Sequence, residues 1–395
     1  MQEFLRLVAR GDVRVEPLVE VELPADRAPE AYAALTSDAP PLAAVLTYDQ
    51  ERATTRPEKP RLAATPDSAR PGDVSLAVVG AGSFLRAMHL PSLKSNPRVA
   101  IRWVVSRRGT DAAELARSLP GAEATSDWNA VLDDPEVDLV LIATRHDSHA
   151  EIAAAALGAG KAVFLEKPLG LSREEIDEVW TAGAADPRLV IGFNRTLAPL
   201  AARLILETRA AAGPAQVIYR VNAPLAAEHW LNDPVQGGGR ILGEACHMFD
   251  FTNALCGRPR RVLAAALPAS PGVATVESTS ATIQYEDGSL ATVHYSGVGS
   301  LELPKERIEV LRGGRSWVLE DFVSLTAFDG GETTESERRQ DKGHAALLSR
   351  AIAATRGEEP FEPGLEAAYM AQSVALAVLE SIASGTPVEV ASPPG

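Results

Sequence analysis

A lysine at the end of an apolar segment is the first side chain in this sequence that is placed to do chemistry. Residues 161–168 read KAVFLEKP, so Lys167 follows a run of apolar residues and a glutamate, Glu166. An ammonium group at the end of a buried strand can exchange a proton with a hydroxyl or carbonyl group of a substrate. The alternative is that Lys167 pairs with Glu166 and is purely structural.

A glycine-rich turn nearer the N-terminus is the second chemical signal. Gly80, Gly82, Ser83 and Phe84 follow a predicted strand and open a predicted helix, which is the context in which such turns bind a dinucleotide. Gly80 permits the tight turn, and Gly82 lets a pyrophosphate approach the N–H groups at the helix start. Leu85 stands where the third glycine of this fingerprint is expected. A tight turn without a ligand is the alternative.

The end of the second predicted strand bears on which dinucleotide is preferred. Sites for NAD usually place a carboxylate there, which accepts a hydrogen bond from the ribose 2′-hydroxyl. This sequence has Ser106, Arg107 and Arg108 instead, and the two guanidinium groups suit the 2′-phosphate of NADP(H). We therefore expect NADP(H) to be favoured over NAD(H), with a solvated turn as the alternative.

Alternating strand and helix signals from Val74 onward predict the fold that positions these residues. The repeated β-α units, with apolar strands such as VDLVLIATR, predict a doubly wound parallel sheet of the α/β class, a Rossmann domain over residues 74–196. Beyond it, longer alternating strands predict an α+β domain over residues 197–395 with an open, mostly antiparallel sheet. Two helices, at about 343–356 and 364–384, close the chain.

The N-terminal part of the sequence has a different pattern of residues from the rest of the chain. Residues 1–50 read helix, strand, helix, strand, and fifty residues are marginal for an independent core. Residues 51–73 contain four prolines, many charges and almost no large apolar residues, so we interpret them as a linker.

Several motifs together are similar to one known family. Glu166-Lys167-Pro168 at a strand end, and Gly238-Gly239 followed by His247 and Asp250, resemble the Gfo/Idh/MocA oxidoreductases over about residues 74–390. The resemblance implies a Rossmann domain that holds a nicotinamide cofactor. It also implies an α/β domain that binds the substrate, whose outer sheet face makes subunit contacts, and a cis bond before Pro168.

A narrower resemblance concerns the bi-domain subgroup of this family, in which the module follows a zinc-type medium-chain alcohol dehydrogenase. Residues 1–50 are similar to the tail of such an enzyme, without its zinc-binding and cofactor-binding parts. We interpret them as a vestigial remnant; the other possibility is a start that cuts a longer fusion. The stretches that carry the subgroup resemblance read ATRHDSHA, GFNR, HWLNDP, GGGRILGEACHMFDF, PKERIEV and DKGH.

The resemblance also implies roles for individual residues of the reaction centre. Lys167 is the expected acid/base, and His247 is expected to orient or protonate the reacting oxygen. The aspartate usual in the family four residues before this histidine is Gly243 here. Glu244 is the candidate replacement, although adjacent helical positions point about 100° apart.

Further residues follow the same resemblance. Those expected near the cofactor are Thr144, His149, Glu166 and Asn194, and those expected on the substrate side are Arg195, His229 and Trp230. Trp230 either stacks on a sugar ring or packs on its own domain. Lys342 and His344 stand out at the start of a predicted helix, but the sequence indicates no role for them.

Composition excludes several classes of function. A formal net charge of −15 argues against nucleic-acid binding and against an anionic membrane surface, and no apolar run approaches the ~20 residues that span a bilayer. The N-terminus has no signal-peptide core, so we expect a cytoplasmic protein. With two cysteines and scattered histidines, we expect neither a disulfide framework nor a metal site.

The sequence therefore predicts an NAD(P)-dependent oxidoreductase that acts on a sugar, a cyclitol or a related polyhydroxylated molecule. Two alternatives stay open: a hydrolase or lyase that keeps its cofactor bound and performs no net redox reaction, and a non-catalytic cofactor-binding protein. From the resemblance we also expect a homodimer or homotetramer. The substrate itself cannot be named, because a fold does not determine its function.

Overall fold

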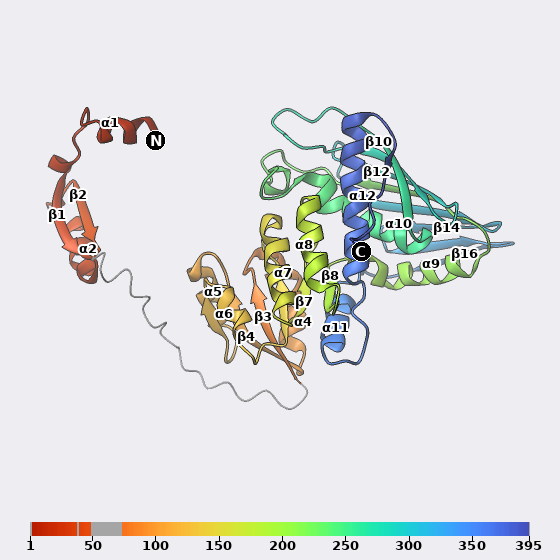
Figure 1. Cartoon of the computed structure of the whole chain (residues 1–395), viewed down its shortest axis with the longest axis horizontal. Helices are drawn as coiled ribbons and strands as arrows, with labels where there is room; N and C mark the ends of the chain where they lie inside the picture. The colour runs from red at the N-terminus through yellow and green to blue at the C-terminus, as the bar shows by residue number, and fades with distance from the viewer. Residues whose placement is uncertain (1, 38, 49–72, 395) are drawn as a thin grey trace. The chain divides into compact units, whose positions relative to one another are not determined.

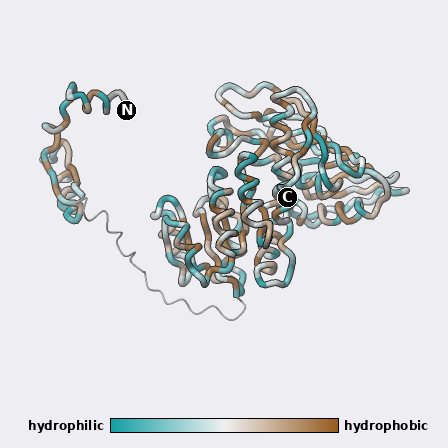
Figure 2. Tube along the Cα trace, in the orientation of Figure 1, coloured by the Kyte–Doolittle hydropathy of each residue, from teal (hydrophilic) through white to brown (hydrophobic). Residues whose placement is uncertain are grey.

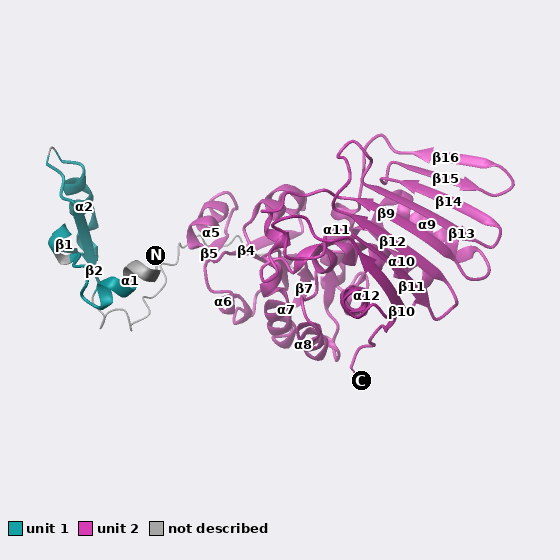
Figure 3. Cartoon of the chain, turned by 90° about the horizontal axis from the view of Figure 1, so that it is seen from above, with its two compact units in different colours: residues 1–62 teal, residues 63–395 magenta. Residues whose placement is uncertain are grey.

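The computed structural model describes residues 2–37, 39–48 and 73–394, which belong to two compact units (Figures 1 and 3). The units comprise residues 1–62 and 63–395. Almost all of the predicted linker, residues 51–73, lies outside the described residues, so that prediction is not tested.

The first unit has the predicted order of helix, strand, helix and strand. After α1 (Gln2–Ala9), β1 (Val19–Pro24) and β2 (Ala43–Thr47) pair in parallel through α2 (Ala28–Leu35). Among the described side chains of this unit only Ala31 is buried. As expected for so short a segment, the unit has no substantial hydrophobic core of its own.

The second unit begins with a six-stranded parallel sheet. Its strand order, β5-β4-β3-β6-β7-β8, is that of a dinucleotide-binding doubly wound fold, with β3 as the first strand. Every residue of β3, β6, β7 and β8 is buried, which confirms that these strands are covered on both faces. The strands are β3 (Val74–Val79), β4 (Val99–Val105), β5 (Glu123–Thr125), β6 (Leu139–Ile142), β7 (Ala162–Leu165) and β8 (Leu189–Ile191).

Helices cover both faces of this sheet, and they come from both ends of the second unit. One face packs on α4 (Leu90–Ser95), α5 (Gly109–Ala116) and α11 (His344–Thr355), and the other on α7 (His149–Gly158), α8 (Arg173–Gly183) and α12 (Leu365–Ser384). A short α6 (Asn129–Leu132) adds to the second layer. Hydrophobic segments gather along the parallel strands between these layers (Figure 2).

The second sheet has nine strands and is mixed. All its pairs are antiparallel except β9 with β12, in the order β16-β15-β14-β13-β9-β12-β11-β10-β17. Buried residues alternate along its inner strands, because one face packs on α9 (Pro199–Ala210), α10 (Cys246–Cys256) and α12 while the other is open (Figure 3). The strands are β9 (Gln216–Asn222), β10 (Pro259–Ala266), β11 (Thr279–Tyr285), β12 (Leu290–Ser296), β13 (Glu306–Arg312), β14 (Arg315–Glu320), β15 (Ser324–Phe328), β16 (Glu332–Ser336) and β17 (Val388–Glu389).

Helix α12 joins the two sheets. It is the one helix in the described part of the chain that is long and apolar enough to span a membrane by length and composition, but 61% of its most apolar stretch is buried inside the protein. Its apolar side chains share one core with both sheets. A core position therefore explains the hydrophobicity of this helix.

Short turns connect the helices and strands, and those of the second unit contain several of the predicted site residues. A π-helical turn, η3 (Leu85–His89), precedes α4, whose second residue, Pro91, lacks the N–H that a regular helix would use. The other short turns are η1 (Glu16–Leu18), η2 (Ala25–Arg27), η4 (His146–Ser148), η5 (Asn194–Leu197), η6 (Trp230–Asn232) and the π-turn η7 (Ile241–Ala245).

A buried carboxylate links the two sheets. Glu306 at the start of β13 accepts hydrogen bonds from Arg195 Nε at 2.8 Å, from Lys342 Nζ at 2.6 Å and from the Tyr219 hydroxyl. Burial alone would raise the pKa of Glu306, but the charges of Arg195 and Lys342 outweigh burial and lower it well below its usual range. One carboxylate thus holds together η5, β9, β13 and the segment before α11.

Replacing this carboxylate should be costly. We expect Glu306→Gln to lower the free energy of unfolding by about 3–5 kcal/mol, because it leaves the buried guanidinium of Arg195 without its counter-charge. Guanidinium unfolding followed by circular dichroism measures the change. Glu359→Gln, which removes an exposed partner of Arg350, is the control and should cost below about 1 kcal/mol.

The same pair of variants gives a pH test. Since the folded-state pKa of Glu306 is lowered, its stabilisation is complete above the unfolded pKa of about 4.3 and is lost as the pH falls below that value. An equal cost for both variants at pH 7 would contradict the assignment.

Candidate active site

The glycine turn after β3 has the shape that a dinucleotide needs. Gly80 has φ +109°, and a Cβ built on it would lie 2.4 Å from the carbonyl oxygen of Ala143, so only glycine fits between β3 and β6. A Cβ on Gly82 would instead enter open space. Ser83 and Phe84 are exposed where the helix begins. The turn therefore leaves backbone N–H groups open to an anion, and these residues fit the pyrophosphate of a dinucleotide.

The end of β4 carries its two arginines on the surface. Arg107 and Arg108 are exposed, while Ser106 is partly buried. Arg108 Nε donates to Asp111 at 2.8 Å, so its charge is already paired. Arg107 is the arginine left to meet a ligand at this strand end.

Thr144 and His149, two residues predicted to contact the cofactor, both follow β6 but have different surroundings. Thr144 is partly accessible and accepts a hydrogen bond from Ser148 Oγ at 2.8 Å. His149 is 1% exposed, and its Nδ1 donates to the carbonyl oxygen of Pro168 at 2.8 Å. The prediction that His149 contacts the cofactor is therefore corrected: it lies behind the turn and holds the backbone that follows Lys167.

Lys167 lies at the carboxyl edge of the parallel sheet, partly accessible, after β7. Its Nζ donates to the carbonyl oxygen of Gly243 at 2.9 Å, which joins the sheet edge to η7, and the bond to Pro168 is cis as the resemblance implied. The neighbouring Glu166 is buried and accepts from His89 Nε2 at 2.6 Å. Burial would raise the pKa of Glu166, but the hydrogen bond and charge of His89 lower it below its usual value.

His247 faces the same edge from α10. It is buried, its ring lies 5.7 Å from that of Phe193, and its Nδ1 has no hydrogen-bond partner. Burial first, and then the charges of Arg195 and Lys167, lower the pKa of His247 well below its ordinary value. The imidazole is therefore neutral at pH 7. Lys167 lies close enough for its positive charge to contribute to this decrease.

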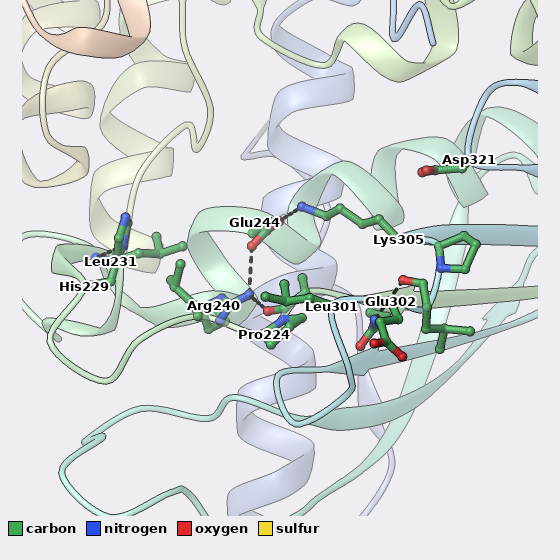
Figure 4. A pocket seen from close by; sticks show the side chains of 14 residues that line it. Pro224, His229, Leu231, Arg240, Glu244, Leu301, Glu302, Lys305 and Asp321 are labelled. Atoms are coloured by element: carbon green, nitrogen blue, oxygen red, sulfur yellow. Dashed lines mark hydrogen bonds and ion pairs between the residues drawn. The ribbon is translucent and has the colours of Figure 1, made fainter. Parts of the chain in front are cut away.

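Glu244 is corrected as an acid/base candidate. Its carboxylate is bound by Lys305 Nζ at 2.7 Å and by Arg240 Nη2 at 3.2 Å (Figure 4). The Tyr295 hydroxyl donates a third hydrogen bond to it. Burial would raise its pKa, but Lys305 and Arg240 lower it to about 2. A carboxylate held ionised by two cations does not donate a proton near pH 7, so Glu244 is a fixed acceptor in the wall of a cavity.

That cavity is linked to the lysine through the backbone of η7. It has a volume of about 600 Å³, and Glu244 in its wall directly follows the residue whose carbonyl binds Lys167. His229 also lines it and accepts the N–H of Leu231 at Nδ1, which leaves Nε2 as a donor. The polar residues of the wall are Asn222, His229, Arg240, Glu244, Glu302, Lys305 and Asp321.

Three other predicted residues turn out to be structural. Arg195 is buried in its ion pair with Glu306, so the predicted contact with substrate is corrected. Asn194 is also buried, and its Nδ2 donates to the carbonyl oxygen of Lys342 at 2.7 Å, which fixes the start of α11 rather than leaving the amide for a cofactor. Trp230 has the guanidinium of Arg145 over its ring at 4.0 Å, so that face is not available to a sugar.

Sequence reasoning missed several residues of the site. His146 lies directly beside Gly243, His89 binds Glu166, and Lys305 binds Glu244. Lys342 and His344, which had no assigned role, pack beside Glu306 and Asn194. The motif stretches HDSH, PKER and DKGH contain four of these residues and were the available signal. No group of three metal-ligating side chains occurs among the described residues.

Comparison with known proteins agrees with this arrangement. A model described as "Oxidoreductase family, NAD-binding Rossmann fold" matches residues 74–192, and one described as "GFO/IDH/MocA C-terminal domain" matches residues 214–311. The chain belongs to the Gfo/Idh/MocA oxidoreductase family. Both models fall in the second unit; residues 1–50 match neither of them.

Curated relatives in this family include sugar and cyclitol enzymes. Levoglucosan dehydrogenase of Pseudarthrobacter phenanthrenivorans is 32% identical over 179 residues, 41% of this chain and 44% of that one. Inositol 2-dehydrogenase 2 of Saccharopolyspora erythraea is 28% identical over 342 residues, 81% of this chain and 97% of that one. The match to the first of these relatives thus spans less than half of its length.

Solved structures share the fold. Levoglucosan dehydrogenase in complex with NADH and levoglucosan superposes with a TM-score of 0.73 at 22% identity, covering 80% of this chain and 99% of that one. The agreement confirms the predicted combination of a Rossmann domain with a second, mostly antiparallel sheet domain.

The glycine turn supports a direct test of cofactor binding. We expect Gly82→Ala to leave the melting temperature nearly unchanged and to weaken binding of NADH and NADPH at least tenfold, because its methyl group enters the space that the pyrophosphate needs. Nicotinamide fluorescence measures binding. Gly158→Ala, which also places its methyl in open space but on α7, is the control and should bind normally. Unweakened binding by Gly82→Ala would place the pyrophosphate elsewhere.

Proposed function

We propose that this protein is an NAD(P)(H)-dependent oxidoreductase of a sugar, cyclitol or sugar-derived carbonyl compound. The observation that carries the proposal is the placement of Lys167. It follows the strand β7 at the edge of the parallel sheet, its charge acts on His247, and its Nζ binds the carbonyl of Gly243, whose neighbour Glu244 lines a polar cavity of about 600 Å³. When bound, a nicotinamide supplies the hydride acceptor or donor, and Gly80, Gly82, Ser83, Phe84 and Thr144 are the residues placed to hold the dinucleotide.

The chain's own residues account for the remaining chemistry. During oxidation of an alcohol the carbon loses a hydride, and the hydroxyl proton must leave its oxygen at the same time. We assign that proton to Lys167 Nζ, which accepts it as the neutral amine and becomes the ammonium ion. His247, neutral and buried, is placed to hydrogen-bond the same oxygen.

The cavity wall supports a polyhydroxylated substrate. It combines a fixed carboxylate, Glu244, with the cations Lys305 and Arg240 and with the imidazole of His229. Acceptors and donors held close together suit neighbouring hydroxyl groups, each of which donates one hydrogen bond and accepts others. The relatives named for levoglucosan and inositol act on molecules of this class.

Replacing Lys167 tests the reaction. We expect Lys167→Met to lower kcat at least 100-fold with levoglucosan or myo-inositol as probe substrate, since a positioned acid/base contributes about 10²–10⁴-fold. The dissociation constants of NADH and NADPH should stay within threefold. Lys94→Met, on the exposed end of α4, is the control. Turnover without reduction of the cofactor would support the non-redox alternative, and failure to bind either cofactor would support the non-catalytic one.

For the cofactor we propose a preference for NADP(H). Support comes from Arg107, which is exposed at the ribose end of the fold, and from the lack of a carboxylate among the residues that end β4. One curated relative, scyllo-inositol 2-dehydrogenase of Bacillus subtilis, is named for NADP(+), whereas a solved relative binds NADH.

The preference can be measured with single variants. We expect Arg107→Ala to weaken NADPH binding about 10–100-fold and to change NADH binding less than threefold, because a charge-assisted hydrogen bond contributes about 1.5–3 kcal/mol. Arg108→Ala removes an arginine already paired with Asp111 and serves as the control. Equal weakening of both cofactors would mean that Arg107 does not contact the 2′-phosphate.

We further propose a homo-oligomer that pairs through the open face of the nine-stranded sheet. That face exposes Ile218, Leu263, Leu311 and Phe328, which would be covered by a second copy.

For residues 1–50 we keep the proposal of a medium-chain dehydrogenase remnant, supported by a β-α-β unit whose described side chains form hardly any core.

A further inference from the structure

The space above Gly243 is filled by another side chain. A Cβ built on Gly243 would lie 2.7 Å from Cε1 and 2.9 Å from Nδ1 of His146. The terminal methyl of Leu231 would be as close, at 2.6 Å, but it ends a flexible side chain. No residue larger than glycine therefore fits at position 243 while His146 keeps its place. This glycine is also the residue whose carbonyl binds Lys167, so His146 and Lys167 meet at the same point of the backbone.

His146 is held in one orientation by the groups around it. Its Nδ1 lies 2.8 Å from the carbonyl oxygen of Gly237, and a carbonyl only accepts, so the ring proton is on Nδ1. The ring packs edge-on against Trp230 at 4.7 Å and against His149 at 5.4 Å. Trp230 is itself fixed under the guanidinium of Arg145. These contacts fix the imidazole without using Nε2.

The second ring nitrogen is a free acceptor at the surface of the site. Nε2 of His146 makes no hydrogen bond within the part of the chain that the structure describes. Nε2 of His149 and Nδ1 of His247 are fully buried and have no partner, whereas Nε2 of His146 is not fully buried. The 4% of His146 that is exposed therefore includes this nitrogen. This nitrogen can therefore be reached by a ligand, and the charge of Lys167 acts on the same ring.

Charge keeps that lone pair available. Burial, and then the positive charge of Lys167, lower the pKa of His146 well below its ordinary value, and His149 and Arg145 act in the same direction. The carbonyl of Gly237 opposes them but does not prevent the net decrease. The imidazole is thus neutral at pH 7 and can only accept at Nε2.

We propose that His146 is a catalytic residue that supplies the acceptor of the reaction centre, with Nε2 receiving a hydrogen bond from the substrate hydroxyl next to the one whose proton passes to the neutral amine of Lys167. This assignment rests on the proposed function. It means that the side-chain acceptor beside the lysine comes from the turn after β6 and not from η7, where residue 243 has no side chain. Lys167, His146 and His247 then form a centre with one ionisable amine and two neutral imidazoles.

Moving the acceptor side chain from position 146 to position 243 tests the proposal. His146→Ala should lower kcat at least 100-fold with NAD(P)⁺ and levoglucosan or myo-inositol, while the cofactor dissociation constants stay within threefold. Gly243→Asp should also be inactive, because its side chain meets the imidazole. The double variant, His146→Ala with Gly243→Asp, places a carboxylate acceptor in the vacated space and should recover at least tenfold over either single variant. Such non-additivity is expected of residues that share one space.

The control is Lys94→Met, on the exposed end of α4, which should not change kcat. Retention of kcat within threefold by His146→Ala would overturn the proposal. So would a double variant no better than the single ones, provided that circular dichroism and cofactor binding show it to be folded.

A spectroscopic measurement decides the proposal independently of turnover. Long-range ¹⁵N-¹H spectra of histidine-labelled protein, assigned with His146→Asn, should show His146 at pH 7 protonated on Nδ1 only. A proton on Nε2, in the neutral or the charged ring, would overturn the proposal whatever the substrate is. Absence of cofactor binding by the wild-type protein would instead refute the proposed function, so the two failures are distinguishable.

Discussion

The buried carboxylate of Glu306 is the constraint on which the arrangement of the site depends. It sits at the start of β13 and binds Arg195, which follows the last strand of the parallel sheet, and Lys342, which precedes α11. A buried ion pair adds little net stability over a well-packed apolar pair, but its loss leaves charges that have no alternative partner. This requirement selects one position of the two sheets relative to each other. The edge that carries Lys167 is thereby brought opposite α10 and its His247.

In this site, the ionised side chains and the neutral histidines have different surroundings and different roles. Two sets of charged side chains are paired and held ionised: Glu244 with Lys305 and Arg240 in the cavity wall, and Arg195 with Glu306 in the interior. The histidines between them are kept neutral by burial and by the surrounding cations. Groups that are locked in one charge state can orient a substrate but do not exchange protons near pH 7. Lys167 differs from these groups, because it is partly accessible and its Nζ is bonded to a backbone carbonyl rather than to a carboxylate.

The sequence predicted what depends on local pattern. We could predict the strands, the glycine turn at Gly80 and the lysine at a strand end, because the residues of each feature are neighbours in the chain. The partners of Glu166 and Glu244 were not predictable in this way, since His89 and Lys305 lie 77 and 61 residues away and no local signal links them. Arg195 and His149 were misassigned for the same reason: their sequence motif places them at the sheet edge, but burial and a distant partner decide their role.

Gly243 shows why an absent side chain is a poor guide to lost function. In the sequence, a glycine at the position of an expected carboxylate favours decay of the reaction centre, and it left a non-catalytic protein as an alternative. In the structure the missing side chain is not a gap, because the side chains of His146 and Leu231 occupy the space next to Gly243. A site that had lost its function would be under no requirement to keep that space filled by a polar ring with one nitrogen bonded and the other free. The paired presence of a small residue and a fixed imidazole is better explained by exchange of one acceptor for another than by loss.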